Sequence, residues 1–171
     1  MRTPFALFFV TFLTTSVLAE PQPRDNQTVA VGPWAIATIY KADKLESCTM
    51  SRPAGELGIT FVRTQDGLAA LLDSRKWRLD RGKTYSVRLV AGSRSLDAKA
   101  LAETKSVTIA LADPRLNSKL RSASVFEVHG DGATLRVPLD GSSAAFERLE
   151  ACFSKREATE INPFVASSRK P

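Results

Sequence analysis

Serine, histidine and aspartate side chains that could support nucleophilic hydrolysis occur in the C-terminal part of the chain. Ser142 and Ser143 follow Gly141, and His129 and Asp131 precede them. A nucleophile elbow needs the pattern Gly-x-Ser-x-Gly, because its sharp turn depends on both glycines, but alanines follow the serines here. We therefore expect Gly141 to form a turn and Ser142 or Ser143 to cap a helix.

His129 is the one histidine of the chain and could act as a general base or as a pH-sensitive group near neutrality. It precedes Gly130-Asp131-Gly132, a sequence typical of a tight hairpin turn. A general base also needs a positioned partner, and Asp131 is the nearest candidate. We expect His129 to be a solvated turn residue; a small periplasmic hydrolase that uses His129 with Asp131 is the alternative.

Other residue types that carry chemistry are sparse or wrongly spaced. Asp140, Glu147 and Glu150 could form paired carboxylates, but Glu147 and Glu150 stand three residues apart, as on the exposed face of a helix. A single histidine and two cysteines without a Cys-x-x-Cys motif cannot complete a tetrahedral zinc site. The sequence also has no phosphate-binding or calcium-binding loop. It therefore predicts no catalytic residue, no metal and no cofactor.

A cluster of cations around Trp77 is the strongest candidate for ligand binding. The chain carries a formal net charge of +6, and five of its 24 basic residues fall within nine positions: Arg75, Lys76, Arg78, Arg81 and Lys83. Such a patch could attract an anionic polymer or lipid head groups by charge steering. Trp77 alternates with Leu79, so we expect it to anchor the core rather than to stack on a ligand. No motif supports nucleic-acid binding.

The first nineteen residues have the three parts of a secretory signal peptide. Arg2 is followed by an apolar run from Phe5 to Leu18, and Val17-Leu18-Ala19 offers a cleavage site after Ala19. A retained membrane anchor would need roughly 20 apolar residues, more than this run provides. Because no cysteine stands immediately after the cleavage site, a lipoprotein is not indicated. We expect a periplasmic or secreted bacterial protein.

Cys48 and Cys152 both follow the predicted cleavage site. In an oxidising compartment an even number of cysteines predicts a disulfide, here one bond between these two residues. Such a bond closes a loop of roughly 100 residues, which the loop-entropy model values at up to about 4.7 kcal/mol. Two buried free thiols are the alternative.

Short apolar segments separated by turn residues indicate a mainly β protein. In Thr84 to Val90 the residues Tyr85, Val87 and Leu89 alternate on one face, and Asp66-Gly67 is typical of a hairpin. Strands are expected at 34–40, 48–50, 57–62, 68–72, 84–90, 98–101, 106–111, 125–128 and 133–139, with a short helix at 115–120 and a longer one at 143–155. This pattern predicts an antiparallel β-sandwich or small barrel with one C-terminal α-helix.

The chain has 171 residues, of which 43% are hydrophobic and 25% charged, so one compact domain is expected. The polar, proline-containing stretch after the signal peptide predicts a flexible leader over residues 20–30. The single β-rich domain is expected over residues 31–157, with Trp34 and Trp77 in its core. Residues 158–171 are expected to form a disordered tail.

Two stretches carry a family resemblance: WRLDRGKTYSV, from Trp77 to Val87, and LDGSSAAFERLEAC, from Leu139 to Cys152. They resemble a group of small exported alphaproteobacterial proteins in which Gly-Ser-x-x-Ala-x-x-x-Leu-x-x-Cys ends the domain. The chain is more distantly similar to the invasion-associated locus B proteins, which are exported and β-rich. It departs from that family in having one cysteine pair and a serine at position 142, where an aromatic residue is common. The resemblance implies location and fold type, and no catalytic residue.

These observations predict a non-enzymatic exported protein that binds an envelope component, a protein partner or a host surface. A periplasmic carrier of a small apolar ligand is a second reading, which requires an apolar cavity inside the β layers.

Overall fold

The computed structural model describes residues 27–42 and 44–159, which form ten strands and two helices. In chain order they are β1 (Gln27–Val31), β2 (Trp34–Lys41), β3 (Lys44–Ala54), β4 (Leu57–Thr64), β5 (Gly67–Ser74), β6 (Thr84–Ala91), β7 (Arg94–Ala102), β8 (Ser106–Ala110), α1 (Pro114–Ser122), β9 (Val125–His129), β10 (Thr134–Pro138) and α2 (Ser142–Thr159).

All ten strands form a single antiparallel sheet with the order β1-β2-β3-β4-β5-β8-β7-β6-β9-β10. The first five strands follow one another through hairpins, whereas β8 lies between β5 and β7. Strands β1 and β10 end the sheet, so it is open and not closed into a barrel. The predicted mainly-β, antiparallel class with a C-terminal helix is confirmed, in a sandwich-like form.

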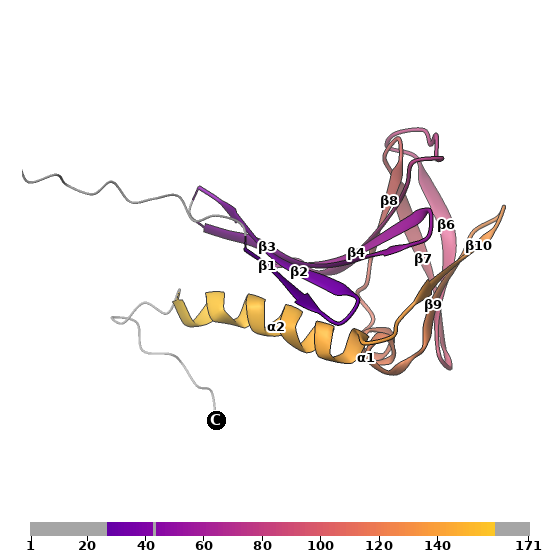
Figure 1. Ribbon diagram of the computed structural model, residues 1–171. Helices are drawn as coiled ribbons and strands as arrows, with labels where there is room; N and C mark the ends of the chain where they lie inside the picture. Colours follow the sequence, from indigo (N-terminus) through magenta and orange to yellow (C-terminus); the bar gives the residue numbers. More distant parts are fainter. Residues whose placement is uncertain (1–26, 43, 160–171) are drawn as a thin grey trace, which may run out of the picture.

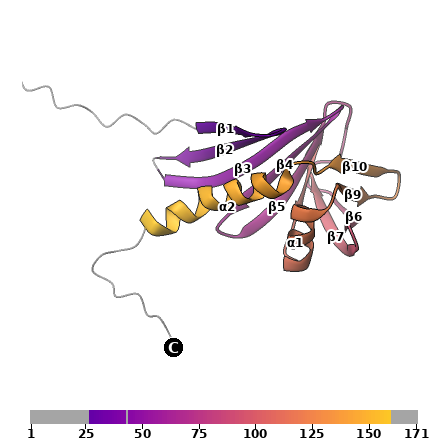
Figure 2. The same ribbon diagram turned by 60° about the horizontal axis from the view of Figure 1, so that its bottom comes forward.

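Both helices lie on the same side of a strongly bent sheet. Figures 1 and 2 show α2 running along β1 to β5, with α1 beside the first turn of α2 and against β6 and β7. The bend brings strands from the two halves of the sheet together: the ring centroid of Phe61 on β4 lies 6.2 Å from that of Phe126 on β9 and 5.0 Å from that of Phe146 on α2. Trp34 adds a fourth ring, 6.0 Å from Phe61. The core therefore lies between the concave face of the sheet and the two helices.

The predicted Cys48–Cys152 disulfide is present. It joins β3 to α2 across 104 residues of sequence, and Cys48 is fully buried. The Thr38 hydroxyl lies 3.3 Å from the Cys152 sulfur. The bond fixes α2 on the sheet, as expected for a structural staple.

Two predicted boundaries need correction. The leader expected over residues 20–30 is too long, because Gln27 to Ala30 lie in β1 and pair in register with β2. Thr28, Val29 and Val31 suit an extended strand, and Gly32, at φ +58°, allows the tight turn that returns the chain. At the other end, α2 continues to Thr159, past the expected start of the tail. The predicted signal peptide (1–19), residues 20–26 and residues 160–171 lie outside the described residues.

The short helix α1 begins as the sequence predicts. Pro114 occupies its first turn, and the Asp113 carboxylate accepts a 2.8 Å hydrogen bond from the backbone N–H of Leu116. Arg94, at the start of β7, also donates to Asp113. The Arg94 hydrogen bond, followed by the Leu116 N–H, holds the pKa of Asp113 below its usual range. Asp113 therefore caps α1 and ties the helix to β7.

Asp113→Asn should remove a pH-dependent part of the stability while keeping the cap, because asparagine caps helices as well as aspartate does. A carboxylate with a lowered pKa in the folded state stabilises the fold above its unfolded pKa of about 3.9, and this contribution disappears as the pH falls through the folded pKa. Urea unfolding at a series of pH values should therefore show the largest difference between wild type and variant above about pH 4, shrinking at lower pH. Asp66→Asn, in an exposed turn, serves as the control. A difference that stays constant with pH would contradict this role.

Candidate functional site

Ser142 has a structural role that differs from the expected one. It is 2% exposed, and its hydroxyl donates a 2.8 Å hydrogen bond to the carbonyl of Leu120 at the end of α1. The hydroxyl therefore joins the two helices and does not cap its own. Gly141 forms the expected turn at φ +72°, and a Cβ there would lie 3.1 Å from Cδ of Pro33. Ser142 therefore presents no nucleophile to solvent, whereas Ser143 is exposed.

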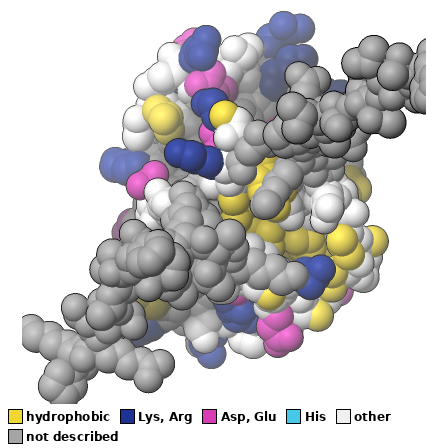
Figure 3. Space-filling model, turned by 90° about the vertical axis from the view of Figure 1, so that its left-hand side faces the viewer, with side chains coloured by type: hydrophobic (Ala, Val, Ile, Leu, Met, Phe, Trp, Pro, Cys, Tyr) yellow, Lys and Arg dark blue, Asp and Glu magenta, His cyan; other side chains and the backbone are white. Residues whose placement is uncertain are grey.

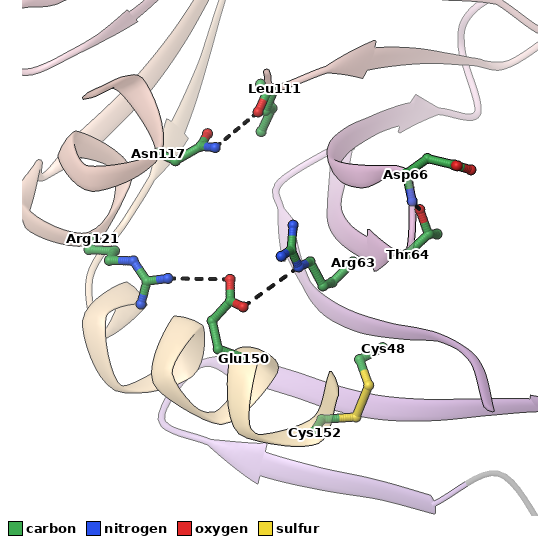
Figure 4. A network of polar contacts seen from close by, with 9 residues as sticks. All are labelled: Cys48, Arg63, Thr64, Asp66, Leu111, Asn117, Arg121, Glu150 and Cys152. Atoms are coloured by element: carbon green, nitrogen blue, oxygen red, sulfur yellow. Dashed lines mark hydrogen bonds and ion pairs between the residues drawn. A yellow bond between two sulfur atoms is a disulfide. The ribbon is translucent and has the colours of Figure 1, made fainter. Parts of the chain in front are cut away.

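Glu150 connects three elements, as Figure 4 shows, although its sequence spacing suggested an exposed helix face. Its carboxylate accepts a 3.4 Å hydrogen bond from Arg121 of α1 and lies 3.6 Å from Nε of Arg63 on β4. Glu147 is exposed, as predicted. The two glutamates therefore do not act as a pair, and Glu150 helps to hold the helices against the sheet.

The predicted basic patch lies on the connection from β5 to β6, and all five of its cations are exposed. The backbone of this connection is held by hydrogen bonds from Leu79 to Thr104 and from Gly82 to Ala102. Three of the cations face carboxylates: Lys76 with Glu56 at 2.5 Å, Arg81 with Glu103 at 2.7 Å and Lys83 with Asp80 at 3.7 Å. Such neutralisation weakens the attraction for anions that the sequence suggested. Trp77 is only partly buried, whereas Trp34 is 1% exposed.

His129 stands at the end of β9 with partners that the sequence analysis did not select. Its Nε2 lies 3.0 Å from Oε2 of Glu127, and its Nδ1 lies 3.2 Å from the hydroxyl of Thr134 on β10. Glu127 also pairs with Arg136 at 3.1 Å. The alternation of a strand places residues two apart on one face, so the Glu127–His129 pair could have been found from the spacing. Asp131, the expected partner, lies in the adjoining turn.

A shallow hollow of about 530 Å³ lies beside His129 and Asp131, lined by β6 and β7 as well. Opposite charges are paired within it, since Arg88 donates a 2.9 Å hydrogen bond to Asp97, which raises the pKa of the guanidinium further. Thr134, His129 and Glu127 could pass a proton along their side chains. The N–H of Gly130 is already bonded to the carbonyl of Ala133 at 2.9 Å, so it is not available to an oxyanion.

The side of the sheet opposite the helices divides into two parts. On β6, β7, β9 and β10 it carries charged side chains, including Arg88, Asp97 and Glu127. On β1 to β5 and β8 the outward positions are uncharged over the area of the sheet that lies between Lys41 on β2 and Asp73 on β5. We call this part the uncharged face; its residues are Thr28, Ala30, Ala35, Ala37, Ile39, Thr49, Ser51, Gly58, Thr60, Val62, Ala69, Leu71, Thr108 and Ala110.

The pairing register shows that these side chains point away from the helices. Ala35, Ser51 and Thr60 lie in one row across β2, β3 and β4, whereas their neighbours Ile36, Met50 and Phe61 form the buried row beneath. Every residue of the uncharged face is half-buried or exposed. A shallow hollow of about 460 Å³ lies over the end of this face near Pro33 and Asp73.

The usual distribution of charge is reversed in this part of the sheet. An antiparallel sheet with one solvated face normally presents polar and charged residues outward. Here Arg52 and Arg63 extend from β3 and β4 toward the helix side, where they pair with Asp140 at 3.0 Å and with Glu150. The run Leu68-Ala-Ala-Leu-Leu72 is apolar on both faces of its strand, a pattern typical of strands that are covered on both sides. That signal could have indicated the uncharged face from the sequence.

Comparison with known proteins assigns no function to these surfaces. No family model, curated protein or solved structure matches the chain. Among residues 27–42 and 44–159, no group of three or more histidine, cysteine or acidic side chains could hold a metal ion. No helix within the same ranges is long and apolar enough to cross a membrane.

Proposed function

We propose that this chain is a non-enzymatic, exported binding protein that docks a protein partner on the uncharged face. The observation that carries the proposal is the absence of charged side chains from the uncharged face, which extends over six neighbouring strands. The central parts of protein interfaces are depleted in charged residues in the same way. Small side chains such as Ala35 and Ser51 also project little from the sheet, which suits contact with a second folded surface.

Two observations support export. Disulfides such as Cys48–Cys152 form and persist in oxidising compartments. The N-terminal sequence also has the three parts of a secretory signal peptide. We propose the periplasm or the medium as the location. The resemblance of the Leu139 to Cys152 motif to small exported alphaproteobacterial proteins, and more distantly to invasion-associated locus B proteins, agrees with this proposal.

Surface binding is favoured over an internal carrier function. A carrier needs space between its β layers for an apolar ligand. In this protein Phe61, Phe126 and Phe146 bring their rings together between the sheet and the helices. The two hollows near Pro33 and near His129 are shallow and open to solvent.

Site-specific photo-crosslinking in the source cells tests the proposed binding face. A photoreactive amino acid at Val62, on the uncharged face, should give an adduct of discrete mass, and one at Lys99, on the charged face of β7, should not. Leu71→Asp should reduce the adduct at least tenfold, because it places an unpaired charge in the interface. Val90→Asp, at a half-buried outward position on β6, is the matched control and should leave the adduct unchanged. Equal labelling from Val62 and Lys99, or no effect of Leu71→Asp, would refute the proposal.

The Thr134–His129–Glu127 arrangement supports hydrolysis as a second candidate. Its hydrogen bonds of 3.2 and 3.0 Å match the order of a nucleophile, a base and an orienting carboxylate. Turnover of ester or glycoside substrates that is lost in both Thr134→Val and His129→Ala would favour this activity. If His129→Ala leaves the Val62 adduct intact and the wild type shows no turnover, binding without catalysis is the better description.

A further inference from the structure

The two edges of the sheet differ in how they are protected from pairing. An exposed edge strand can join a strand of another chain, and proteins commonly prevent this with charged residues, proline or bulges. Strand β10 carries Arg136 and ends at Pro138. Strand β1, Gln27–Val31, has no charged residue, no proline and an uninterrupted register with β2. In Figure 2 it forms the outer border of the sheet, with no described element beyond it.

The free side of β1 can be assigned from its hairpin. Val31 and Trp34 flank the two-residue turn, so they form a hydrogen-bonded pair, and the ladder alternates from there. The backbone N–H and C=O groups of Val29 are therefore hydrogen-bonded to those of Ile36 on β2. The N–H and C=O groups of Thr28 and Ala30 consequently point to the open edge. The edge is thus a short template of two donors and two acceptors, placed symmetrically about Val29.

We propose that β1 pairs antiparallel with β1 of a second copy of this chain, across a two-fold axis at Val29. Thr28 of each copy then faces Ala30 of the other, and four backbone hydrogen bonds form. The two Val29 side chains meet at a non-hydrogen-bonded pair, where Cβ atoms lie roughly 4.5–5.5 Å apart. The dimer would extend the sheet continuously.

A second copy fits this edge better than an unrelated strand for three reasons. Each copy offers the same uncharged strand, so the pairing brings no like charges together. Val29 is 45% exposed although it lies on the core side of the sheet beside Ile36, and pairing would cover it. Because β10 is protected, pairing would stop at a dimer and not continue into a fibre.

The helices leave room for this pairing. Helix α2 contacts mainly β2 and β3, with fewer contacts to β1. With strands about 4.8 Å apart, the two α2 helices of a dimer would be separated by about four strand spacings, roughly 19 Å. Packed helices approach to 8–10 Å, so the copies do not clash. Figure 3 faces the end of the molecule at which α2 ends in Figure 1, and it shows hydrophobic side chains there with charged side chains around them.

Analytical ultracentrifugation of the protein over a wide concentration range tests the proposal. The contact involves five residues a side, below the size of a stable interface, so a weak, concentration-dependent dimer is expected. Val29→Lys should weaken dimerisation at least tenfold, because it places two cations opposite each other. Leu101→Lys, at a 51% exposed position on β7, is the matched control and should dimerise as the wild type does. A wild type that stays monomeric near 1 mM protein, roughly a thousandfold above micromolar affinity, would overturn the proposal.

Hydrogen exchange identifies the edge that is used. The amides of Thr28 and Ala30 should exchange rapidly in dilute protein and become protected as the dimer forms, while the amide of Val29 is protected throughout. Ala30→Pro provides a second variant, since it removes an outward N–H that β2 does not need. It should abolish the dimer and leave the far-ultraviolet spectrum unchanged. Dimerisation that persists in both variants, or protection that does not depend on concentration, would exclude this edge.

The test is independent of the proposed binding face. Val29 points to the helix side, whereas Val62 and Leu71 point away from it. A Val29→Lys protein that is monomeric yet still gives the Val62 adduct would support both proposals. A wild type that dimerises but gives no Val62 adduct would count against the binding face and leave the dimer supported.

Discussion

Removal of the Cys48–Cys152 disulfide should lower the free energy of unfolding by up to about 4.7 kcal/mol. The bond closes 104 residues and restricts the unfolded chain, while in the folded state it holds α2 against β3. Stabilities of single domains are about 5–15 kcal/mol, so a loss of this size is a large part of the total. The Cys48→Ala/Cys152→Ala double variant is preferred to serines, because Cys48 is fully buried and a hydroxyl there would need a partner.

Urea unfolding of the wild type and the double variant, each with and without reductant, measures this effect. The reduced wild type should unfold near the midpoint of the double variant, and reductant should not change the double variant. Thr38→Val is the control, because it removes the hydroxyl beside the Cys152 sulfur and keeps the bond. Equal midpoints for the oxidised wild type and the double variant would show that the bond contributes no stability.

Phe61→Ala should destabilise the protein by about 3–5 kcal/mol. Phe61 is fully buried, and its ring lies 5.0–6.2 Å from those of Trp34, Phe126 and Phe146. Truncation would leave a cavity where both halves of the sheet and α2 meet, so few neighbours could move in to fill it.

Two substitutions serve as controls for this experiment. Phe61→Leu keeps much of the volume and should lose clearly less stability than Phe61→Ala. Val62→Ala, the next residue along β4, removes an outward and half-buried side chain and should cost less than about 1.5 kcal/mol. The denaturation midpoints of the four proteins rank these effects. A Phe61→Ala protein as stable as Val62→Ala would mean that the aromatic cluster does not hold the two halves together.

Local patterns were sufficient to predict most individual elements. The alternation of Tyr85, Val87 and Leu89 correctly predicted β6, because one face of that strand packs on the core. Asp66-Gly67 correctly predicted the β4–β5 hairpin, since the turn chemistry is contained in the sequence. The disulfide was predictable from the even cysteine count together with the predicted signal peptide.

Features that depend on distant partners were not predictable from the same patterns. Strand β1 is only five residues long and follows a polar, proline-containing stretch, and it becomes a strand because it pairs with β2. The partners of Glu150 come from α1 and β4, and no spacing within one helix indicates them. Strand β8 lies between β5 and β7 in the sheet. Local propensity predicts that this segment is a strand, but it does not predict which strands are its neighbours.

The position of β8 affects the order in which the chain can fold. Synthesis delivers a chain from its N-terminus, so β1 to β5 can form a meander as soon as they emerge. Strand β5 then remains an open edge until Ser106–Ala110 arrives, and Cys48 cannot meet its partner until position 152 has followed. Such long-range contacts slow folding, and an open apolar edge favours aggregation meanwhile. We therefore expect the N-terminal half to be the part most exposed to aggregation during folding, and the disulfide to form late.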